Sequence, residues 1–273
     1  MIPAAFDFVR AGSADEAVSL LAQHGDEAKL LAGGHSLLPL MKLRLATPSV
    51  LVDVGRLTDL SYIRDGGDHV AIGALTRHRE LQTSDVLGAE VPILAHVAGL
   101  VGDPQVRHRG TIGGSLAHGD PASDLPAVVL ALGGTLVARG PSGERQIAAT
   151  DFFTGFLETA LAPDELLTEI RLPKVGGAGW SYQKFHRRAQ DWAIVGVAAV
   201  RNGSTGVALV NMGSVPVRAT AVEQALAGGA SAADAAASAA EGTDPSSDLN
   251  ATVEYRQHLA RVLVRRALEE AGA

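Results

Sequence analysis

The chain has 273 residues, of which 47% are hydrophobic and 19% are charged, a composition that excludes a disordered or fibrous protein and supports a globular core. It contains no cysteine, which excludes disulfide scaffolds, thiol nucleophiles and iron–sulfur clusters held by this chain alone. The 23 Lys and Arg residues against 30 Asp and Glu residues give a net charge of -7, which argues against a general attraction to nucleic acid or anionic membranes.

The sequence predicts neither a secretory signal nor a membrane span. Residues 1–10 have no basic start and no apolar run before Asp7, so a cytoplasmic location is expected. The longest uncharged apolar stretch, Leu125–Ala138, contains Pro126 and a glycine pair. It is shorter than the roughly 18–20 residues that a transmembrane helix requires.

The first half of the chain reads as alternating helices and strands. Ser13-Ala-Asp-Glu16 is a capping box that predicts a helix to about His24. The apolar runs 28–32 and 50–54 predict strands, so an α/β opening is expected. The further elements expected in this half are a hairpin around 65–68, helices over about 77–83, 91–100 and 122–132, and a second hairpin around 140–143.

The second half begins at a glycine-rich segment, residues 174–179. We place a domain boundary there. Residues 1–173 then form one domain with subdomains of about 1–55 and 56–173, and residues 174–273 form a smaller one. The elements expected in the smaller domain are strands over 180–186, 193–201 and 205–212, a helix near 218–227 and a final helix from about Val253.

A glycine pair follows the strand predicted over residues 28–32. In Leu31-Ala-Gly33-Gly34-His35-Ser36, two consecutive glycines permit positive φ and let main-chain amides turn toward one point. The short helix that follows adds partial positive charge at its start. This pattern is typical of an anion-binding nest.

A second glycine pair, in Arg109-Gly-Thr111-Ile-Gly113-Gly114-Ser115, repeats two glycines followed by a hydroxyl group. Two nests of this kind would grip the two phosphates of one dinucleotide from opposite sides. Each pair alone is equally explained by a tight turn, and that alternative stays open. Neither matches the Gly-x-Gly-x-x-Gly fingerprint or a Walker loop, so a nicotinamide Rossmann site and a nucleoside triphosphatase site have no local support.

Two carboxylates follow the second pair. Asp120 precedes Pro121 at an expected helix start, where a carboxylate caps well. Asp124 lies one turn later, where it could accept hydrogen bonds from sugar hydroxyls.

The segments 32–44 and 111–126 together resemble the FAD-binding medium subunit of molybdenum hydroxylases, a family that includes the aerobic carbon monoxide dehydrogenase medium subunit and the flavin subunit of xanthine dehydrogenase. The similarity extends to Phe6-Asp-Phe-Val-Arg10, Leu167–Pro173, Asn211-Met-Gly-Ser and 255–268, so it covers the whole chain. The resemblance implies an α+β protein: a vanillyl-oxidase (PCMH) type FAD-binding domain of two α/β subdomains, followed by a C-terminal α+β flavoprotein domain.

The resemblance also assigns FAD-binding residues by position. One side of the pyrophosphate would be wrapped by Ala32, Gly33, Gly34, His35, Ser36 and Leu37, and the other side by Thr111, Gly113, Gly114 and Ser115. Related chains often have Asn at Ser115, so one amide contact is expected to be missing here. Asp124 would bind ribose hydroxyls or the adenosine end.

Four further positions are assigned near the isoalloxazine ring. Lys184 would donate to the pyrimidine edge of the flavin, where negative charge grows on reduction, and Trp192 would cover one flavin face. Ile170, with Leu166, would contribute an apolar wall. Ordinary structural roles remain open for each: a solvated lysine, a core tryptophan and core packing.

No metal site is expected, and no catalytic triad or acid–base dyad is required of the chain, so its catalytic residues stay unassigned. The nine histidines show no His-Glu-x-x-His pattern, and the nearest pairs, His69 with His78 and His108 with His118, lack a ligand set.

The resemblance implies an FAD-dependent oxidoreductase subunit that works with two partners. A large molybdopterin subunit would oxidise the substrate, and a small subunit with two 2Fe–2S clusters would relay electrons, in a dimer of heterotrimers. The FAD would pass them to a quinone, oxygen or NAD. The alternatives are a free-standing FAD-dependent oxidoreductase of the same fold and a nucleotide-binding module without redox activity.

Overall fold

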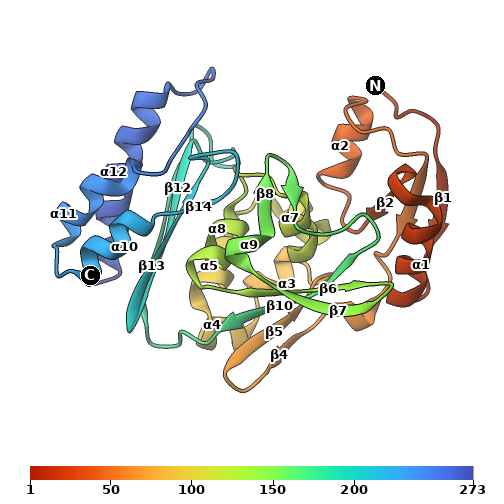
Figure 1. The fold of residues 1–273 in the computed structure, drawn as a ribbon, viewed down its shortest axis with the longest axis horizontal. Helices are drawn as coiled ribbons and strands as arrows, with labels where there is room; N and C mark the ends of the chain where they lie inside the picture. Colours follow the sequence, from red (N-terminus) through yellow and green to blue (C-terminus); the bar gives the residue numbers. More distant parts are fainter. Residues whose placement is uncertain (273) are drawn as a thin grey trace.

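Three sheets and their helices build the molecule, and the computed structural model describes residues 1–272 (Figure 1). The first sheet is parallel, in the order β1-β3-β2. Its elements are β1 (Asp7–Arg10), α1 (Ala14–His24), β2 (Ala28–Leu31), α2 (Leu37–Lys42) and β3 (Val50–Asp53). The predicted order of strands and helices in this region is therefore confirmed.

Helix α1 begins where the capping residues predict. The Ser13 Oγ accepts a hydrogen bond from the Glu16 amide at 3.1 Å. The Glu16 carboxylate reaches back to the Gly12 amide at 2.7 Å, one residue earlier than in a standard capping box. Ala17, Val18 and Leu21 of this helix are buried against the first sheet.

The second sheet is antiparallel, in the order β4-β5-β10-β6-β7. Its strands are β4 (Ile63–Asp65), β5 (His69–Gly73), β6 (Thr135–Gly140), β7 (Gly143–Ala148) and β10 (Leu166–Pro173). The helices of this region are α3 (His78–Gln82), α4 (Asp85–Glu90), α5 (Pro92–Leu100), α6 (Pro104–Arg109), α7 (Ile112–His118), α8 (Asp124–Ala131) and α9 (Ala149–Phe152), with the small ribbon β8 (Phe153–Gly155) and β9 (Glu158–Thr159). Both predicted hairpins are present.

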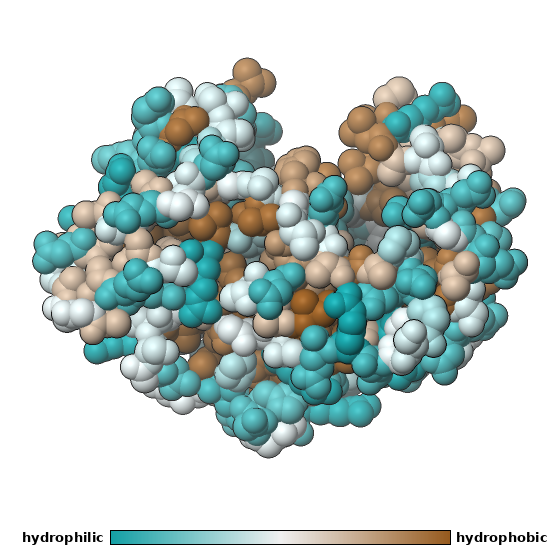
Figure 2. Space-filling view, viewed as in Figure 1, coloured by the Kyte–Doolittle hydropathy of each residue, from teal (hydrophilic) through white to brown (hydrophobic). Residues whose placement is uncertain are grey.

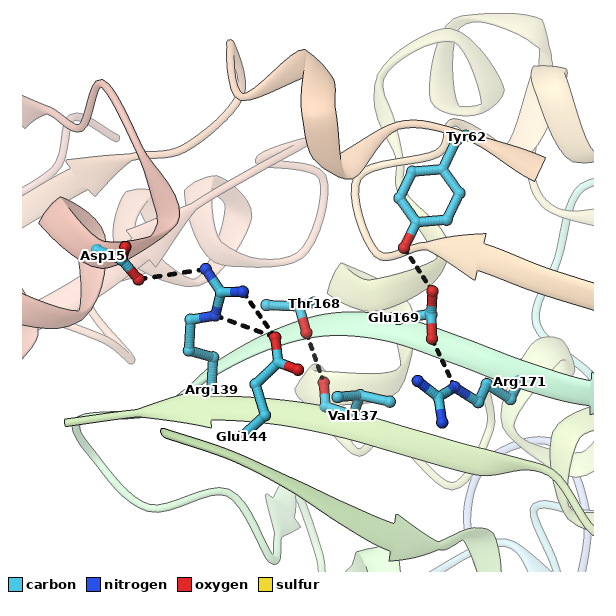
Figure 3. A network of polar contacts seen from close by, with 8 residues as sticks. All are labelled: Asp15, Tyr62, Val137, Arg139, Glu144, Thr168, Glu169 and Arg171. Atoms are coloured by element: carbon cyan, nitrogen blue, oxygen red, sulfur yellow. Dashed lines mark hydrogen bonds and ion pairs between the residues drawn. The ribbon is translucent and has the colours of Figure 1, made fainter. Parts of the chain in front are cut away.

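Figure 3 shows three separate groups of polar contacts within this sheet and between the sheet and its surroundings. Arg139 on β6 pairs with Glu144 of β7 at 2.7 Å and with Asp15 of α1 at 3.2 Å, so it connects the second sheet to the first subdomain. At a bulge in β10, the Thr168 hydroxyl donates to the Val137 carbonyl. The Tyr62 hydroxyl donates to Glu169, also on β10, at 2.6 Å.

The third sheet is antiparallel, in the order β11-β12-β13-β14. Its elements are β11 (Gly179–Phe185), β12 (Val195–Asn202), β13 (Ser204–Val210), β14 (Val217–Arg218), α10 (Thr220–Ala227), α11 (Ala232–Ala236) and α12 (Val253–Glu270). Helix α12 packs on β11 and β12. The three predicted strands, the helix near 218–227 and the final helix are confirmed.

Helix α8 lies between the second and third sheets, and all of its residues are buried. One hydrophobic cluster includes Val129 of α8, Ile170 of the second sheet, and Ala198 and Ala208 of the third. The two domains predicted on either side of residues 174–179 therefore share one hydrophobic cluster. Among the described residues, no helix is both long and apolar enough to cross a membrane.

Candidate dinucleotide site

A cavity of about 720 Å³ lies where the parts of the chain built on the three sheets meet. Its wall includes residues of β2 and the turn before α2, of α7, of the ribbon β8–β9, and of the segment that joins β11 to β12. In Figure 2 the surface is hollowed between the N-terminal lobe on the right and the centre of the molecule. The volume falls within the range of about 300–1,000 Å³ that is typical of small-molecule sites.

The first glycine pair presents free amides to this cavity. Gly34 has a φ of 80°, which turns the chain sharply between β2 and α2. Within the described part of the chain, the amides of Gly33, Gly34, His35 and Ser36 donate to no other protein group, although these residues line the cavity. Consecutive free amides at a helix start are the arrangement that binds phosphate oxygens.

The two glycine motifs touch each other. A Cβ at Gly33 would collide with the Arg109 carbonyl, and it would lie 3.0 Å from the Cα of Gly110. Arg77 holds this contact in place, because its guanidinium donates to the carbonyls of Arg109 and, at 3.4 Å, of Gly55. Gly33 is therefore required for the close approach of two backbones, a role that its turn pattern alone does not reveal.

The second glycine pair differs from the prediction. Its amides are already bonded: Ile112 donates to Thr76, Gly113 to Ala74, and Gly114 and Ser115 to the Oγ1 and carbonyl of Thr111. A Cβ at Gly113 would lie 2.6 Å from the Ala74 carbonyl oxygen, so this glycine permits tight packing of α7 on the end of β5. The second pair is thus not the amide nest that the sequence predicts.

Hydroxyl groups remain as donors on this side. The Ser115 and Ser123 hydroxyls lie 3.1 Å apart, and both residues line the cavity with Thr111, Gly113 and Gly114. The Thr111 hydroxyl is occupied in capping α7, where it accepts from Gly114 at 3.1 Å. One hydroxyl of the serine pair retains a proton that it can direct into the cavity.

Asp124 and Lys184 form a buried ion pair in the cavity wall. The Lys184 Nζ lies 2.8 Å from the Asp124 Oδ2, and each side chain is only 8% exposed. The Tyr182 hydroxyl donates to the other carboxylate oxygen at 2.6 Å, and burial raises the pKa of Tyr182 well above its usual value, so the phenol stays a donor. The Lys184 ammonium retains donor capacity beyond its bonds to Asp124 and the Leu100 carbonyl.

Tyr182 is not among the site residues predicted from the sequence, although its spacing from Lys184 indicated that the two side chains lie together. Side chains two residues apart on a strand share a face, and both Tyr182 and Lys184 lie on β11. Their two side chains therefore meet the same carboxylate, at the first residue of α8.

Trp192 and Leu166 line the cavity, whereas Ile170 does not. Trp192 is 58% exposed, which leaves its ring available for a ligand and contradicts the alternative of a core tryptophan. Ile170 is 0% exposed in the middle of β10, where it pairs with Ile72 and Leu136. The expectation that Ile170 walls the site is therefore not met, because its side chain is part of the sheet's core.

His78 is a second residue that sequence reasoning missed. It lines the cavity, is 4% exposed, and its Nδ1 has no hydrogen-bond partner within the described residues. Burial, assisted by His35 and two arginines, lowers the pKa of His78 to about 4, so the imidazole is neutral at pH 7. No group of His, Asp and Glu residues in the described chain is arranged to hold a metal ion.

Comparison with known proteins assigns the chain to a family. Residues 4–175 match the FAD binding domain in molybdopterin dehydrogenase, and residues 180–271 match the CO dehydrogenase flavoprotein C-terminal domain. Together, the two matches account for most of the described chain.

Full-length relatives agree with this assignment. The carbon monoxide dehydrogenase medium chain of Hydrogenophaga pseudoflava is 42% identical over 100% of this chain and 99% of its own length. The glyceraldehyde dehydrogenase medium chain of Sulfolobus acidocaldarius is 36% identical over 99% of each chain. The solved structure of carbon monoxide dehydrogenase from Hydrogenophaga pseudoflava superposes with a TM-score of 0.96 at 43% identity, over 100% of this chain and 99% of that one.

The residues present in the cavity fit FAD. The free amides at Gly33 to Ser36 suit a pyrophosphate, the closeness of Gly33 to Arg109 leaves no room there for a side chain, and the buried ammonium of Lys184 suits a ligand that gains electrons. The family assignment, which covers the whole chain, and these features agree on the cofactor. The chain belongs to the FAD-binding medium subunits of molybdenum hydroxylases and is an FAD-dependent oxidoreductase subunit.

Proposed function

We propose that this chain is the electron-transfer subunit of a heterotrimeric molybdenum hydroxylase of the carbon monoxide or xanthine dehydrogenase type. It takes electrons from the 2Fe–2S clusters of a small partner subunit, which receives them from a large molybdopterin subunit, and it passes them to an external acceptor. That acceptor is a quinone, oxygen or NAD, and the assembly is a dimer of heterotrimers.

The composition supports a partner for the electron relay. These 273 residues contain no cysteine, and biological iron–sulfur clusters are held mainly by cysteine thiolates. Electrons that reach this chain through such clusters therefore come from a different polypeptide.

The observation that carries the proposal is a cavity whose wall combines free amides, a buried ammonium and an exposed aromatic ring. When bound, FAD supplies the one- and two-electron chemistry. The chain's own groups bind and tune it: the amides of Gly33 to Ser36 bind phosphate oxygens, the Lys184 ammonium places positive charge in the wall, and Trp192 offers a flat apolar surface.

Reconstitution and affinity purification test the proposal. The purified chain mixed with FAD should show bound flavin absorbance and a raised melting temperature. Photoreduced flavin on the chain should reoxidise with a quinone or dye, and the tagged chain should co-purify with a molybdenum subunit and an iron–sulfur subunit from its native cells. Steady turnover of a substrate by the isolated chain without partners would instead favour a free-standing oxidoreductase.

Lys184→Met tests the tuning role. Removing the ammonium should lower the midpoint potential of bound FAD by about 30–60 mV, which corresponds to roughly 1.4–2.8 kcal/mol for a two-electron couple. Because this variant leaves Asp124 as an unpaired buried charge, which also disfavours a reduced flavin, the double variant Lys184→Met with Asp124→Asn should restore stability and retain only the part of the decrease that comes from losing the ammonium. Lys174→Met, which breaks a pair with Asp65 outside the cavity, should leave the potential unchanged.

A further inference from the structure

The loop that carries Trp192 is held on its N-terminal side by an exposed contact, in which the Arg187 guanidinium donates to the Asn250 side chain at 3.2 Å, and on its C-terminal side by buried residues. The Ile194 amide donates to the Phe185 carbonyl at 2.8 Å and closes a loop over residues 186–193. Within the loop, Arg188 and Asp191 form an exposed pair at 3.4 Å. Ala193 and Ile194, by contrast, are buried. The buried backbone immediately after Trp192 is therefore the firmer of these two attachments of the loop.

Asn211 supplies that anchor. Its side-chain Nδ2 donates to the Ala193 carbonyl at 2.9 Å and to the Ile194 carbonyl at 3.4 Å. Its own amide donates to the Pro121 carbonyl at 2.8 Å, in the turn that leads to Asp124. One residue thus connects the base of the Trp192 loop to the turn that carries the buried carboxylate.

The residue type at position 211 meets two requirements at once. The backbone is left-handed, with a φ of 61°, a conformation that glycine and asparagine tolerate best. The side chain must also donate to two carbonyl oxygens. Glycine tolerates the left-handed backbone but has no side chain to donate. Aspartate would place carboxylate oxygens, which only accept hydrogen bonds, against the carbonyl oxygens of Ala193 and Ile194.

A second donor supports the same segment from another element. The Arg256 guanidinium of α12, which is 1% exposed, donates to the Ile194 carbonyl and pairs with Asp248 at 2.8 Å. Because the Ala193 carbonyl receives its side-chain bond from Asn211 alone among the described residues, loss of Asn211 leaves the carbonyl next to Trp192 without that partner.

We infer that Asn211 is a positioning residue for the flavin site: it fixes the base of the Trp192 loop against the turn before Asp124, and thereby holds the Trp192 ring at the cavity. The role of Trp192 toward FAD rests on the proposed function. The anchoring of Trp192 by Asn211 is a property of the chain itself and is testable without FAD.

The first experiment measures the mobility of Trp192 in the FAD-free protein. Trp180→Phe removes the only other tryptophan, so the remaining fluorescence reports Trp192. Adding Asn211→Gly, which keeps the left-handed backbone and deletes the amide, should lower the fluorescence anisotropy and raise acrylamide quenching about twofold. Arg44→Gly, at an exposed left-handed residue outside the cavity (φ 58°), should change neither.

The second experiment is a double-mutant cycle on FAD affinity. Asn211→Gly should raise the Kd for FAD about five- to tenfold, as expected for loss of one to two neutral hydrogen bonds. In a Trp192→Leu background it should have almost no further effect, because the two residues act through one contact. Asn211→Asp should behave like Asn211→Gly and serves as the second variant if the glycine variant folds poorly.

The outcomes separate the two claims. Unchanged quenching in Asn211→Gly, or additive effects of Asn211→Gly and Trp192→Leu on the Kd, would overturn the positioning role. A parent protein that binds no FAD would refute the proposed function and would leave the quenching comparison as the deciding test of Asn211.

Discussion

The two glycine pairs share a sequence pattern but use their amides differently. Within residues 1–272, the amides of Gly33 to Ser36 donate to no protein group and these residues line the cavity, whereas the amides of Ile112 to Ser115 bond to Ala74, Thr76 and Thr111. The first pair follows a short strand, and although Gly33 lies against the Arg109 carbonyl, none of its amides donates to a protein acceptor among residues 1–272. The second pair packs against the segment after β5, where the Thr76 and Ala74 carbonyls accept the amides of Ile112 and Gly113, and Thr111 accepts those of Gly114 and Ser115. A glycine pair therefore indicates close backbone approach, and its surroundings decide whether amides remain for a ligand.

The largest effect is expected at Gly33, where a substitution tests whether the glycine is needed for backbone contact with Arg109 or only for a turn. Gly33→Ala would drive a Cβ into the Arg109 carbonyl, so FAD affinity should fall by about 10- to 100-fold and the melting temperature should fall as well. Isothermal titration and thermal unfolding measure both. Gly88→Ala on α4, where a Cβ would meet nothing within 4 Å, is the matched control and should be neutral or slightly stabilising. Unaltered FAD binding by Gly33→Ala would show that the two motifs need not touch.

A pH-dependent effect should come from His78, whose ring packs on Gly110 beside the second pair. Because burial lowers the folded-state pKa of His78 to about 4, against 6.5 in the unfolded chain, only the unfolded chain binds this proton between these values. The stability is therefore complete above pH 6.5 and should decline by about 1.4 kcal/mol per pH unit as the pH falls toward 4.

Denaturant unfolding at pH 7 and pH 5 measures this decline. In His78→Gln the difference between the two pH values should shrink by about 2 kcal/mol, whereas His258→Gln, at an exposed position, should leave it as in the parent. Equal pH dependence in parent and His78→Gln would show that the imidazole is not held neutral.

A smaller effect should follow from removing a helix cap in the second motif. Thr111→Ala deletes the oxygen that accepts from the Gly114 amide and should cost about 1 kcal/mol of unfolding free energy. Thr252→Ala deletes the equivalent cap of α12 and should cost a similar amount. FAD affinity should fall only in Thr111→Ala, since α12 lies outside the cavity. Equal affinity in both variants would mean that the cap of α7 does not shape the site.

The smallest effect sharpens the contrast between amides and hydroxyls. Ser36→Ala keeps the free amide of the first motif, so the Kd for FAD should change by less than about twofold. Ser115→Ala removes a hydroxyl where no free amide remains and should raise the Kd by about 2- to 10-fold, the range expected for one neutral hydrogen bond. If the order of the two effects is reversed, the first motif binds through its side chain rather than its backbone.

Local patterns predicted what depends on neighbours in sequence. The capping residues located α1, and strand periodicity located three of the four strands of the third sheet. No strand was predicted over 166–173, although β10 is the middle strand of the second sheet. Its place is defined by pairing with β5 and β6, which are distant in sequence.

The site shows the same division. Most of the residues that the resemblance assigns to FAD line one cavity. Ile170 does not, because its side chain is buried against neighbouring strands. The pairing of Asp124 with Lys184 and Tyr182 joins residues about 60 positions apart. Whether the amides of each glycine pair are free or bonded depends on the part of the chain that packs against that pair. These facts arise from tertiary contacts and are not present in any short segment.

Helix α8 has a consequence for how the protein unfolds. It is buried on all sides between two domains that sequence comparison treats separately, and its cluster includes residues of both. Neither half can lose its structure without exposing the apolar helix to water, so the chain should melt in a single cooperative transition. The junction between the two matched domains, near residue 176, is thus not expected to separate two independently folding units.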